Sequence, residues 1–313
     1  PPLPCSTPPT QGGSVLPART MSMSSGQLKR VSTAELIPIG DYLKSTPVTE
    51  IPKERDPFLL REDMEPGTAF KKMGAEWVRA CPVLDLTGSE IIGSLDLRET
   101  SKYVIAAYKS GVSNGKSPTG GRRRGSLVFG NAEWKEQATT IAEMARKRPF
   151  VAVEPDASVF DIAVILSGGS HIVGVKGGPP ETGGLSTIIT QAMLFNFCAP
   201  KIMDLKVDVG QMMSSPAVCV KTTDPALKAF ETMASKNISA VAVVDSSDGA
   251  IVHHTSTSDI KMLFNGDDTE EMKMMDTIEE FLVKLRASQT RGKTKIPVST
   301  CQKTDTLGSV LRR

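Results

Sequence analysis

The chain has 313 residues, with 37 Lys and Arg against 35 Asp and Glu, and hydrophobic residues make up 39% of it. This is the composition of a globular protein with room for two or three domains. The net charge of +2 gives no reason to expect nucleic acid or an anionic membrane as a partner. Apolar runs such as residues 238–245 are far shorter than the about 20 residues that a membrane-spanning helix needs, so we expect no transmembrane segment.

The cysteines are five in number and form no Cys-x-x-Cys pair. Reduced thiols in a cytoplasmic, or nuclear, protein therefore fit better than a disulfide framework or a zinc site. The chain does not begin with Met, and its last residues lie within a predicted helix, so we expect a fragment of a longer protein.

Three segments differ in composition from the rest. Residues 1–32 are rich in Pro, Ser, Thr and Gly and are predicted to be a disordered tail. Residues 109–135 have the same character and are predicted to form a flexible Gly/Arg loop. Residues 267–292 are predicted to be a charged linker, with a helix over 279–285 where apolar residues recur at helical spacing.

Between these segments a strand-helix-strand-strand-helix pattern recurs. The clearest copy has strands at 218–220, 240–244 and 251–256, a helix over 226–235 after Asp224 as N-cap and Pro225, and a second helix from Ser258 or Asp259. In the second copy Pro155-Asp156 is the predicted start signal for a helix over 159–166. The pattern predicts an α+β protein of repeats at 42–108, 136–199 and 204–266, with the start of a fourth at 293–313 that is truncated in its helix.

The segments around the last two strands carry a family resemblance. The middle strands lie in residues 78–85, 170–175 and 238–245, and the third strands lead into residues 93–99, 188–193 and 255–259. These repeats resemble cystathionine-beta-synthase (CBS) domains, whose last helix opens with a small hydroxyl residue, two variable residues and Asp. Residues 256–259 match that signature fully, residues 96–99 depart in both polar positions, and residues 190–193 keep only the hydroxyl.

Tandem copies without a visible catalytic domain are most similar to the gamma regulatory subunits of AMP-activated protein kinase and their yeast and plant relatives. The resemblance implies CBS repeats paired into pseudo-twofold modules, the first with the second and the third with the fourth. It also implies ligand clefts between the paired sheets. The expected function is non-catalytic sensing of AMP, ADP or ATP, without a cofactor. The expected partners are the catalytic and scaffold subunits of a protein kinase, or other CBS modules through self-association.

The resemblance implies a ribose-binding role for the residues at the start of the last helices. A single carboxylate can accept hydrogen bonds from both hydroxyls of a ribose diol. Asp259, together with Ser256, is placed for this, and its alternative role is that of a plain N-cap. In the first repeat Glu99 takes the acid position, and Asp96 adds a negative charge that would repel a phosphate. In the second repeat Thr190 keeps the hydroxyl and Met193 replaces the acid.

The resemblance implies phosphate contacts for basic residues before the middle strands. Arg79 occupies the place of a phosphate-contacting arginine, with packing of its stem over Trp77 as the alternative. His171 matches the histidine of a His-Arg pair and could instead be a rim histidine. Lys236, with the residue after it, replaces that pair in the third repeat and supplies charge without the planar fork of arginine.

Ser126 and Ser32 each follow a basic cluster and are candidate phosphorylation sites, although an unmodified basic loop fits as well. The two neighbouring histidines at 253–254 point to opposite faces of a strand, so we expect no metal site. No motif of an enzyme is present, and we expect no catalysis. Two other functions fit the sequence: a CBS-domain scaffold or dimerisation protein with degenerate nucleotide sites, and the regulatory part of a larger enzyme or transporter.

Overall fold

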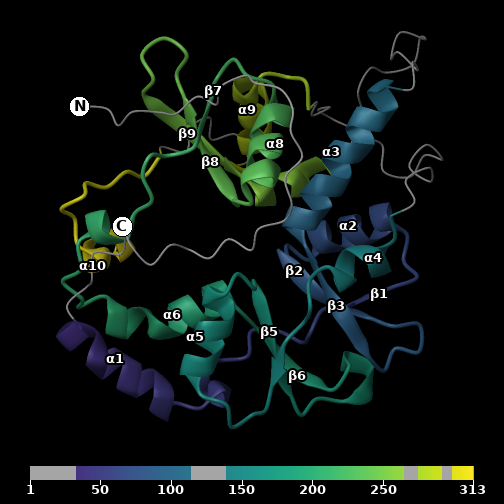
Figure 1. Cartoon of the computed structure of the whole chain (residues 1–313), viewed down its shortest axis with the longest axis vertical. Helices are drawn as coiled ribbons and strands as arrows, with labels where there is room; N and C mark the ends of the chain where they lie inside the picture. The colour runs from purple at the N-terminus through teal and green to yellow at the C-terminus, as the bar shows by residue number, and fades with distance from the viewer. Residues whose placement is uncertain (1–32, 114–138, 264–273, 291–297, 313) are drawn as a thin grey trace, which may run out of the picture.

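A computed structural model describes residues 33–113, 139–263, 274–290 and 298–312 (Figure 1). The predicted tail at 1–32, most of the Gly/Arg loop and both candidate phosphorylation sites, Ser32 and Ser126, lie outside these residues. No helix in the described part of the chain combines the length and apolar character needed to cross a bilayer.

The predicted α+β repeats are confirmed, and three of them follow one another along the chain (Figure 1). The first consists of β1 (Leu60–Arg61), α2 (Pro66–Ala75), β2 (Ala80–Leu84), β3 (Ile91–Asp96) and α3 (Leu97–Ser113). The second consists of α4 (Ile141–Arg146), β4 (Ala152–Val153), α5 (Val159–Ser167), β5 (Ile172–Lys176), η3 (Pro180–Thr182), β6 (Leu185–Thr190) and α6 (Gln191–Ile202). The third consists of α7 (Val209–Met212), β7 (Cys219–Lys221), α8 (Ala226–Lys236), β8 (Ala240–Val244), β9 (Ile251–Ser256) and the 3-10 helix η4 (Thr257–Leu263). Outside the repeats lie α1 (Thr33–Ser45), η1 (Val48–Glu50), α9 (Ile278–Thr290) and α10 (Leu307–Leu311).

α5 and α8 begin at the predicted residues, 159 and 226, but the residues that precede them as N-caps differ from the predicted start signals. α5 begins after Ser158, whose hydroxyl accepts a hydrogen bond from the backbone N–H of Asp161, so the cap lies beyond Pro155-Asp156. The N-cap of α8 is Pro225 rather than Asp224. The Asp224 carboxylate instead accepts hydrogen bonds from Lys221 N and Lys228 Nζ, both at 2.8 Å. A side chain that can cap a helix also has other local partners, and the sequence does not rank them.

The three sheets share one strand order and one register. In each, the first strand runs parallel to the second, and the second runs antiparallel to the third. The last residue of the third strand pairs with the first residue of the second strand in all three: Asp96 with Ala80, Thr190 with Ile172, and Ser256 with Ala240. Positions in one repeat can therefore be matched to positions in another by strand pairing rather than by sequence alone.

The first two repeats exchange their leading segments, which confirms the predicted pairing. α4 of the second repeat packs on β3, and its Ile141 and Met144 are buried in the core of the first repeat. Gly93 permits this approach, because a Cβ at Gly93 would collide with the backbone carbonyl of Ala145. In return, Val48 from the segment before the first repeat is buried in the core of the second.

The leading segment of the third repeat bonds to the start of the fourth in the same way. Leu307 N donates to Val207 O and Val209 N to Asp305 O, just as Val159 N donates to Thr46 O and Val48 N to Ala157 O. The predicted pairing of the third repeat with the fourth therefore holds for the described residues.

The hydrophobic core also extends between the two paired modules. One hydrophobic cluster joins the first and third repeats, where α3 packs against α8 and Lys109 forms an ion pair with Glu231 (2.7 Å). The helix predicted over 279–285 is α9, and it is more than a linker. α9 lies beside α8 (Figure 1). Its Phe281 packs edge-on against Phe230 of α8, with ring centroids 5.8 Å apart, and its apolar residues belong to the hydrophobic core that includes the third repeat.

Among the described cysteines, Cys81, Cys198 and Cys301 are free thiols, as expected. Cys219 is disulfide-bonded, which corrects the expectation that the cysteines are reduced. A single disulfide leaves no spacing motif that would reveal it in the sequence.

Candidate functional site

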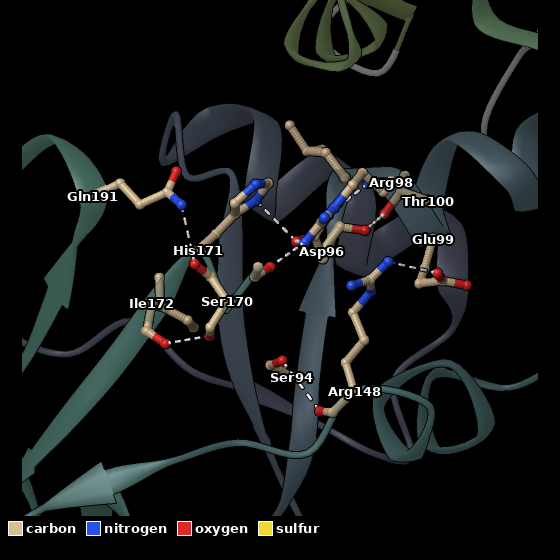
Figure 2. Close-up of polar contacts among 12 residues, drawn as sticks. Ser94, Asp96, Arg98, Glu99, Thr100, Arg148, Ser170, His171, Ile172 and Gln191 are labelled. Carbon is tan, nitrogen blue, oxygen red and sulfur yellow. Dashed lines mark hydrogen bonds and ion pairs between the residues drawn. The ribbon is translucent and has the colours of Figure 1, made fainter. Parts of the chain in front are cut away.

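The interface between the first and second repeats has two related halves, which differ in whether they hold a cavity. The open half is a cavity of about 260 Å³. It is lined by residues 54–58 and 77–80 of the first repeat and by residues 171–172, 188 and 190–193 of the second. The closed half is formed by Asp96, Arg98, Glu99, Arg148 and His171, whose charged groups contact one another (Figure 2).

Three basic side chains line the open half. Arg79 stands directly before β2, and its Nε donates to Ser258 Oγ of the third repeat (2.9 Å). Arg55 stands before β1, and its Nη1 donates to the carbonyl of Glu76 (3.0 Å). His171 stands before β5, at the position equivalent to Arg79. The carboxylates in the lining are Glu54 and Asp56, on the exposed segment that also carries Arg55.

A buried lysine lies beside the open half. Lys261 of η4 is only 3% exposed, and its Nζ donates to the carbonyl of Trp77 (2.9 Å). The same Nζ lies 5.8 Å from the centroid of the indole ring, within the range of a cation–π contact. Burial, together with the nearby Arg79 and Arg55, lowers the pKa of Lys261 to about 8. Three basic groups, Lys261, Arg79 and Arg55, therefore lie close together at this corner of the molecule.

Asp96 is the centre of the closed half (Figure 2). Arg98 donates to it through Nε (3.1 Å) and Nη2 (2.9 Å), and Nδ1 of His171 lies 2.9 Å from its Oδ2. Burial alone would raise the pKa of the Asp96 carboxyl. The contacts with His171 and Arg98 outweigh burial and hold that pKa well below its usual range. The negative charge that was expected to repel a phosphate is thus neutralised within the protein.

Glu99 completes the closed half. Its Oε1 accepts hydrogen bonds from Lys102 (2.9 Å) and from Arg148 (3.0 Å), whose side chain crosses over from the second repeat (Figure 2). Burial raises the pKa of the Glu99 carboxyl, but Lys102 and Arg148 together lower it below its usual value. With Arg148 engaged in this ion pair, the acid predicted to hold a ribose is already occupied.

In the third repeat the acid of the signature, Asp259, bonds only within its own repeat among the contacts described. Oδ2 of Asp259 accepts hydrogen bonds from Thr255 Oγ1 and from the backbone N–H of Ser256, both at 2.9 Å. Ser256 Oγ accepts from Ser258 N (3.3 Å). Asp259 lies within η4 (Thr257–Leu263) and bonds to residues that precede the helix, so it is not the N-cap that the sequence offered as the alternative. Neither Asp259 nor Ser256 lines the open half.

Lys236 lies away from both halves. It is the last residue of α8 and is exposed, and Asn237 after it has φ +52°. Strand pairing shows that the residue equivalent to Arg79 and His171 in the third repeat is Ser239, which stands directly before β8. The predicted match of Lys236 and Asn237 to the His-Arg pair is therefore wrong by three residues, since Ser239 and Ala240 stand at those positions.

The structure therefore brings Arg79, His171 and Thr190 together in the open half, and Asp96, Glu99 and His171 in the closed half. Sequence reasoning missed Arg55 and Lys261. A signal existed for Arg55, because an arginine precedes Pro-Phe before the first strand in both repeats, at residues 55–58 and 148–150. Lys261 had no signal, since its role depends on packing between the first and third repeats.

Comparisons with known proteins agree with this architecture. The CBS domain family profile matches residues 209–262. A protein of Arabidopsis thaliana named "SNF1-related protein kinase regulatory subunit gamma-1-like" is 25% identical over 185 residues. That match covers 55% of this chain and 41% of the Arabidopsis protein, so the chain spans less than half of its relative.

A solved structure shares the fold over most of the chain. It is a protein of Methanocaldococcus jannaschii, described as a candidate archaeal homologue of gamma-AMPK, with a TM-score of 0.58 at 14% identity. The match covers 85% of this chain and 88% of the archaeal protein. The chain is thus built of tandem CBS-type repeats and resembles gamma-type regulatory subunits of AMP-activated protein kinase.

Proposed function

We propose that this protein is a non-catalytic regulatory subunit that binds an adenine nucleotide (AMP, ADP or ATP) and thereby modulates a protein kinase. The observation that carries the proposal is the open half of the interface between the first two repeats. It combines a cavity of about 260 Å³, close to the size of small-molecule sites, with basic side chains and apolar walls.

The polar groups suit a phosphorylated ligand. Arg79 and Arg55 are guanidinium groups, which bind phosphate oxygens through paired hydrogen bonds. His171 lies beside them and adds a third nitrogen donor at the inner wall. The aromatic and aliphatic side chains of the lining offer an apolar surface for a base: Phe58, Trp77, Val78, Ile172, Ile188 and Met193.

The same residues offer a route for regulation. Arg79 is hydrogen-bonded to Ser258, and Trp77 to Lys261, so the wall of the open half is also part of the contact with the third repeat. A ligand that engages Arg79 would change this contact and shift the equilibrium between two packings of the repeats. Such a shift requires different ligand affinity for the two packings. The kinase partner is proposed from the name of the Arabidopsis relative.

Calorimetric titration of the chain with AMP, ADP and ATP tests the proposal. We expect micromolar binding of at least one nucleotide. Arg79→Ala should weaken it at least tenfold, since a hydrogen bond to a charged group contributes about 1.5–3 kcal/mol. Arg61→Ala, an exposed arginine that does not line the cavity, is the matched control and should bind like the wild type.

A second variant tests the site predicted in the third repeat. If the nucleotide binds at the 256–259 signature, Asp259→Ala will abolish binding and Arg79→Ala will not. An absence of binding up to millimolar nucleotide would instead favour a CBS-domain scaffold or dimerisation protein. The occupied carboxylates of Glu99 and Asp259 support that second candidate, because both ribose-type acids already have partners inside the protein.

A further inference from the structure

The residue that ends α2 is unusual for its backbone conformation. The backbone N–H of Trp77 donates to Gly74 O (3.0 Å) and that of Val78 to Met73 O (3.1 Å), the hydrogen-bond pattern of a Schellman motif. Trp77 therefore stands in the left-handed region, with φ +54°. Glycine is the usual residue there and asparagine the usual substitute. The other repeats follow this rule, with Gly169 (φ +100°) and Asn237 (φ +52°) at the equivalent positions.

A tryptophan is an unfavourable choice at such a position unless its side chain has a separate role. The indole is not in the core, since Trp77 is 62% exposed, and it lines the open half. Lys261 fixes this segment from the side of the third repeat, through the carbonyl of Trp77 and the contact with the ring. A large flat apolar surface is thus held in place at the wall of the cavity.

The part of the cavity lined by the start of α6 has no acid that could bind a ribose diol. Met193 occupies the position of Glu99 and Asp259, and it is 6% exposed. The hydroxyl oxygen of Thr190 accepts a hydrogen bond from the N–H of Met193 (3.1 Å) as the cap of α6. Gln191 donates its amide to Leu166 O (3.3 Å) and Ser170 O (3.1 Å). Thr190 and Gln191 thus make hydrogen bonds within the second repeat, and no carboxylate stands at the start of α6. The carboxylates that line the cavity, Glu54 and Asp56, lie on the segment before β1.

We infer that the open half selects its ligand by an aromatic ring, stacked on Trp77, and by a phosphate, and that it does not discriminate on the 2′-hydroxyl of the sugar. This inference rests on the proposed function and specifies its ligand class. Base stacking on an aromatic side chain is tolerant of the sugar, whereas recognition of a diol needs an acid such as the one that Met193 replaces.

Intrinsic fluorescence gives a direct test. The chain has two tryptophans, so in the Trp134→Phe variant Trp77 is the reporter. We expect AMP and 2′-deoxy-AMP to quench Trp77 with affinities within about twofold of each other. Ribose 5-phosphate, which has no ring, should bind at least about tenfold more weakly. A preference of tenfold or more for AMP over 2′-deoxy-AMP overturns the inference. If Glu54→Gln then removes that preference, Glu54 is the residue that binds the ribose diol.

A second variant distinguishes the effect of the Trp77 ring on binding from the effect of its backbone conformation. Trp77→Gly suits the left-handed conformation and so should fold at least as well as the wild type. We expect calorimetry to show that it binds AMP about tenfold more weakly, the scale of one lost stacking contact, and binds ribose 5-phosphate as before. Asn237→Gly makes the same backbone change in the third repeat and should leave AMP affinity unchanged.

The outcomes distinguish this inference from the proposed function. If AMP binds the wild type and Trp77→Gly with equal affinity, the stacking role is wrong while nucleotide binding stands. If neither AMP nor 2′-deoxy-AMP binds the wild type up to millimolar concentration, the proposed function fails, and the inference fails with it.

Discussion

The two halves of the interface between the first and second repeats are built from equivalent strands and helices. One half contains an ion pair across the interface, and the other is lined as a cavity. In the closed half, Arg148 of the second repeat reaches across the interface and forms an ion pair with Glu99 of the first (3.0 Å; Figure 2). In the open half, the equivalent of Glu99 is Met193 and the equivalent of Arg148 is Arg55. Among the described residues, Arg55 has no carboxylate to meet across the interface. It instead bonds to the Glu76 carbonyl (3.0 Å) and forms an exposed ion pair with the Glu76 carboxylate (3.6 Å), both within the first repeat, and it lines the cavity.

The expectation that a ligand site is marked by the acid at the start of the last helix does not hold for these two repeats. The repeat that lacks the acid of the signature, at residues 190–193, is the one whose last helix begins at the cavity. The repeat that retains an acid has used it in an internal ion pair. A buried acid helps a ligand only when no basic side chain of the protein can reach it first. Whether a site is open therefore depends on the charge of the residue facing it from the partner repeat.

The largest effect is expected from breaking the closed half at its centre. Asp96→Asn leaves Arg98 and His171 without a buried counter-charge, and should lower the free energy of unfolding by about 3–5 kcal/mol. Urea unfolding measures this loss. Asp56→Asn is the control, since Asp56 pairs with Lys53 in an exposed position and should cost less than about 1 kcal/mol. Equal losses in the two variants would mean that the closed half does not hold the repeats together.

Wild type and Asp96→Asn also differ in how their stability depends on pH. Because the pKa of Asp96 is lowered in the folded state, its stabilisation is fully present above the ordinary carboxyl pKa and is lost as pH falls towards the folded value. The stability difference between wild type and Asp96→Asn should therefore be constant near neutral pH and shrink below about pH 4. A difference that stays constant down to pH 2 would contradict the lowered pKa.

Much of the fold could be predicted from the sequence. The repeats at 136–199 and 204–266 were identifiable because turn residues separate short apolar strands from capped helices at a regular interval. α9 shows the limit of that reading. Its charged residues predicted a linker, yet Ile278, Phe281 and Leu285 are buried between elements that are distant in sequence. Periodicity shows that a helix has an apolar face and cannot show which repeat that face enters.

The candidate site was predictable only in part. Arg79 and His171 were predicted from the resemblance to gamma-type CBS repeats, and strand pairing shows that they stand at equivalent positions before β2 and β5. Lys236 was misplaced because short repeats align ambiguously until strand pairing fixes the register at Ser239 and Ala240. The occupation of Glu99 by Arg148 could not be predicted, since it depends on side-chain reach across the interface between two repeats.

The next largest effect is expected on the pH dependence of stability, because Lys261 beside the open half is buried in its charged form. Burial, with Arg79 and Arg55, lowers the pKa of Lys261 from 10.5 to about 8. Between these values the unfolded chain binds more protons than the folded one, so stability rises with pH by up to about 3 kcal/mol. Lys261→Met should lack this rise, whereas Lys176→Met, which changes an exposed lysine, should keep it. Parallel stability curves for wild type and Lys261→Met from pH 7 to 10.5 would show that Lys261 is not buried as a charge.

A single substitution should convert the open half into a closed one. Met193→Glu places a carboxylate opposite Arg55, as Glu99 lies opposite Arg148, and should weaken nucleotide binding by about tenfold or more, or about 1.4 kcal/mol. Met193→Gln has the same size without the charge and should bind within about threefold of wild type. Calorimetry with AMP compares the two. If both variants lose affinity equally, side-chain volume rather than charge pairing decides which half is open.

The smallest effect tests whether the open half is linked to the third repeat. In the absence of ligand, Arg79 Nε donates to Ser258 Oγ (2.9 Å), an exposed hydrogen bond that contributes on the order of 0.5–1 kcal/mol. If a phosphate must take Arg79 away from this partner, Ser258→Ala removes the competition and should tighten AMP binding about two- to fivefold. Ser247→Ala, in the exposed turn of the third repeat, should have no effect. If Ser258→Ala instead weakens binding, the serine positions Arg79 for the ligand, and the third repeat supports the open half rather than competing with it.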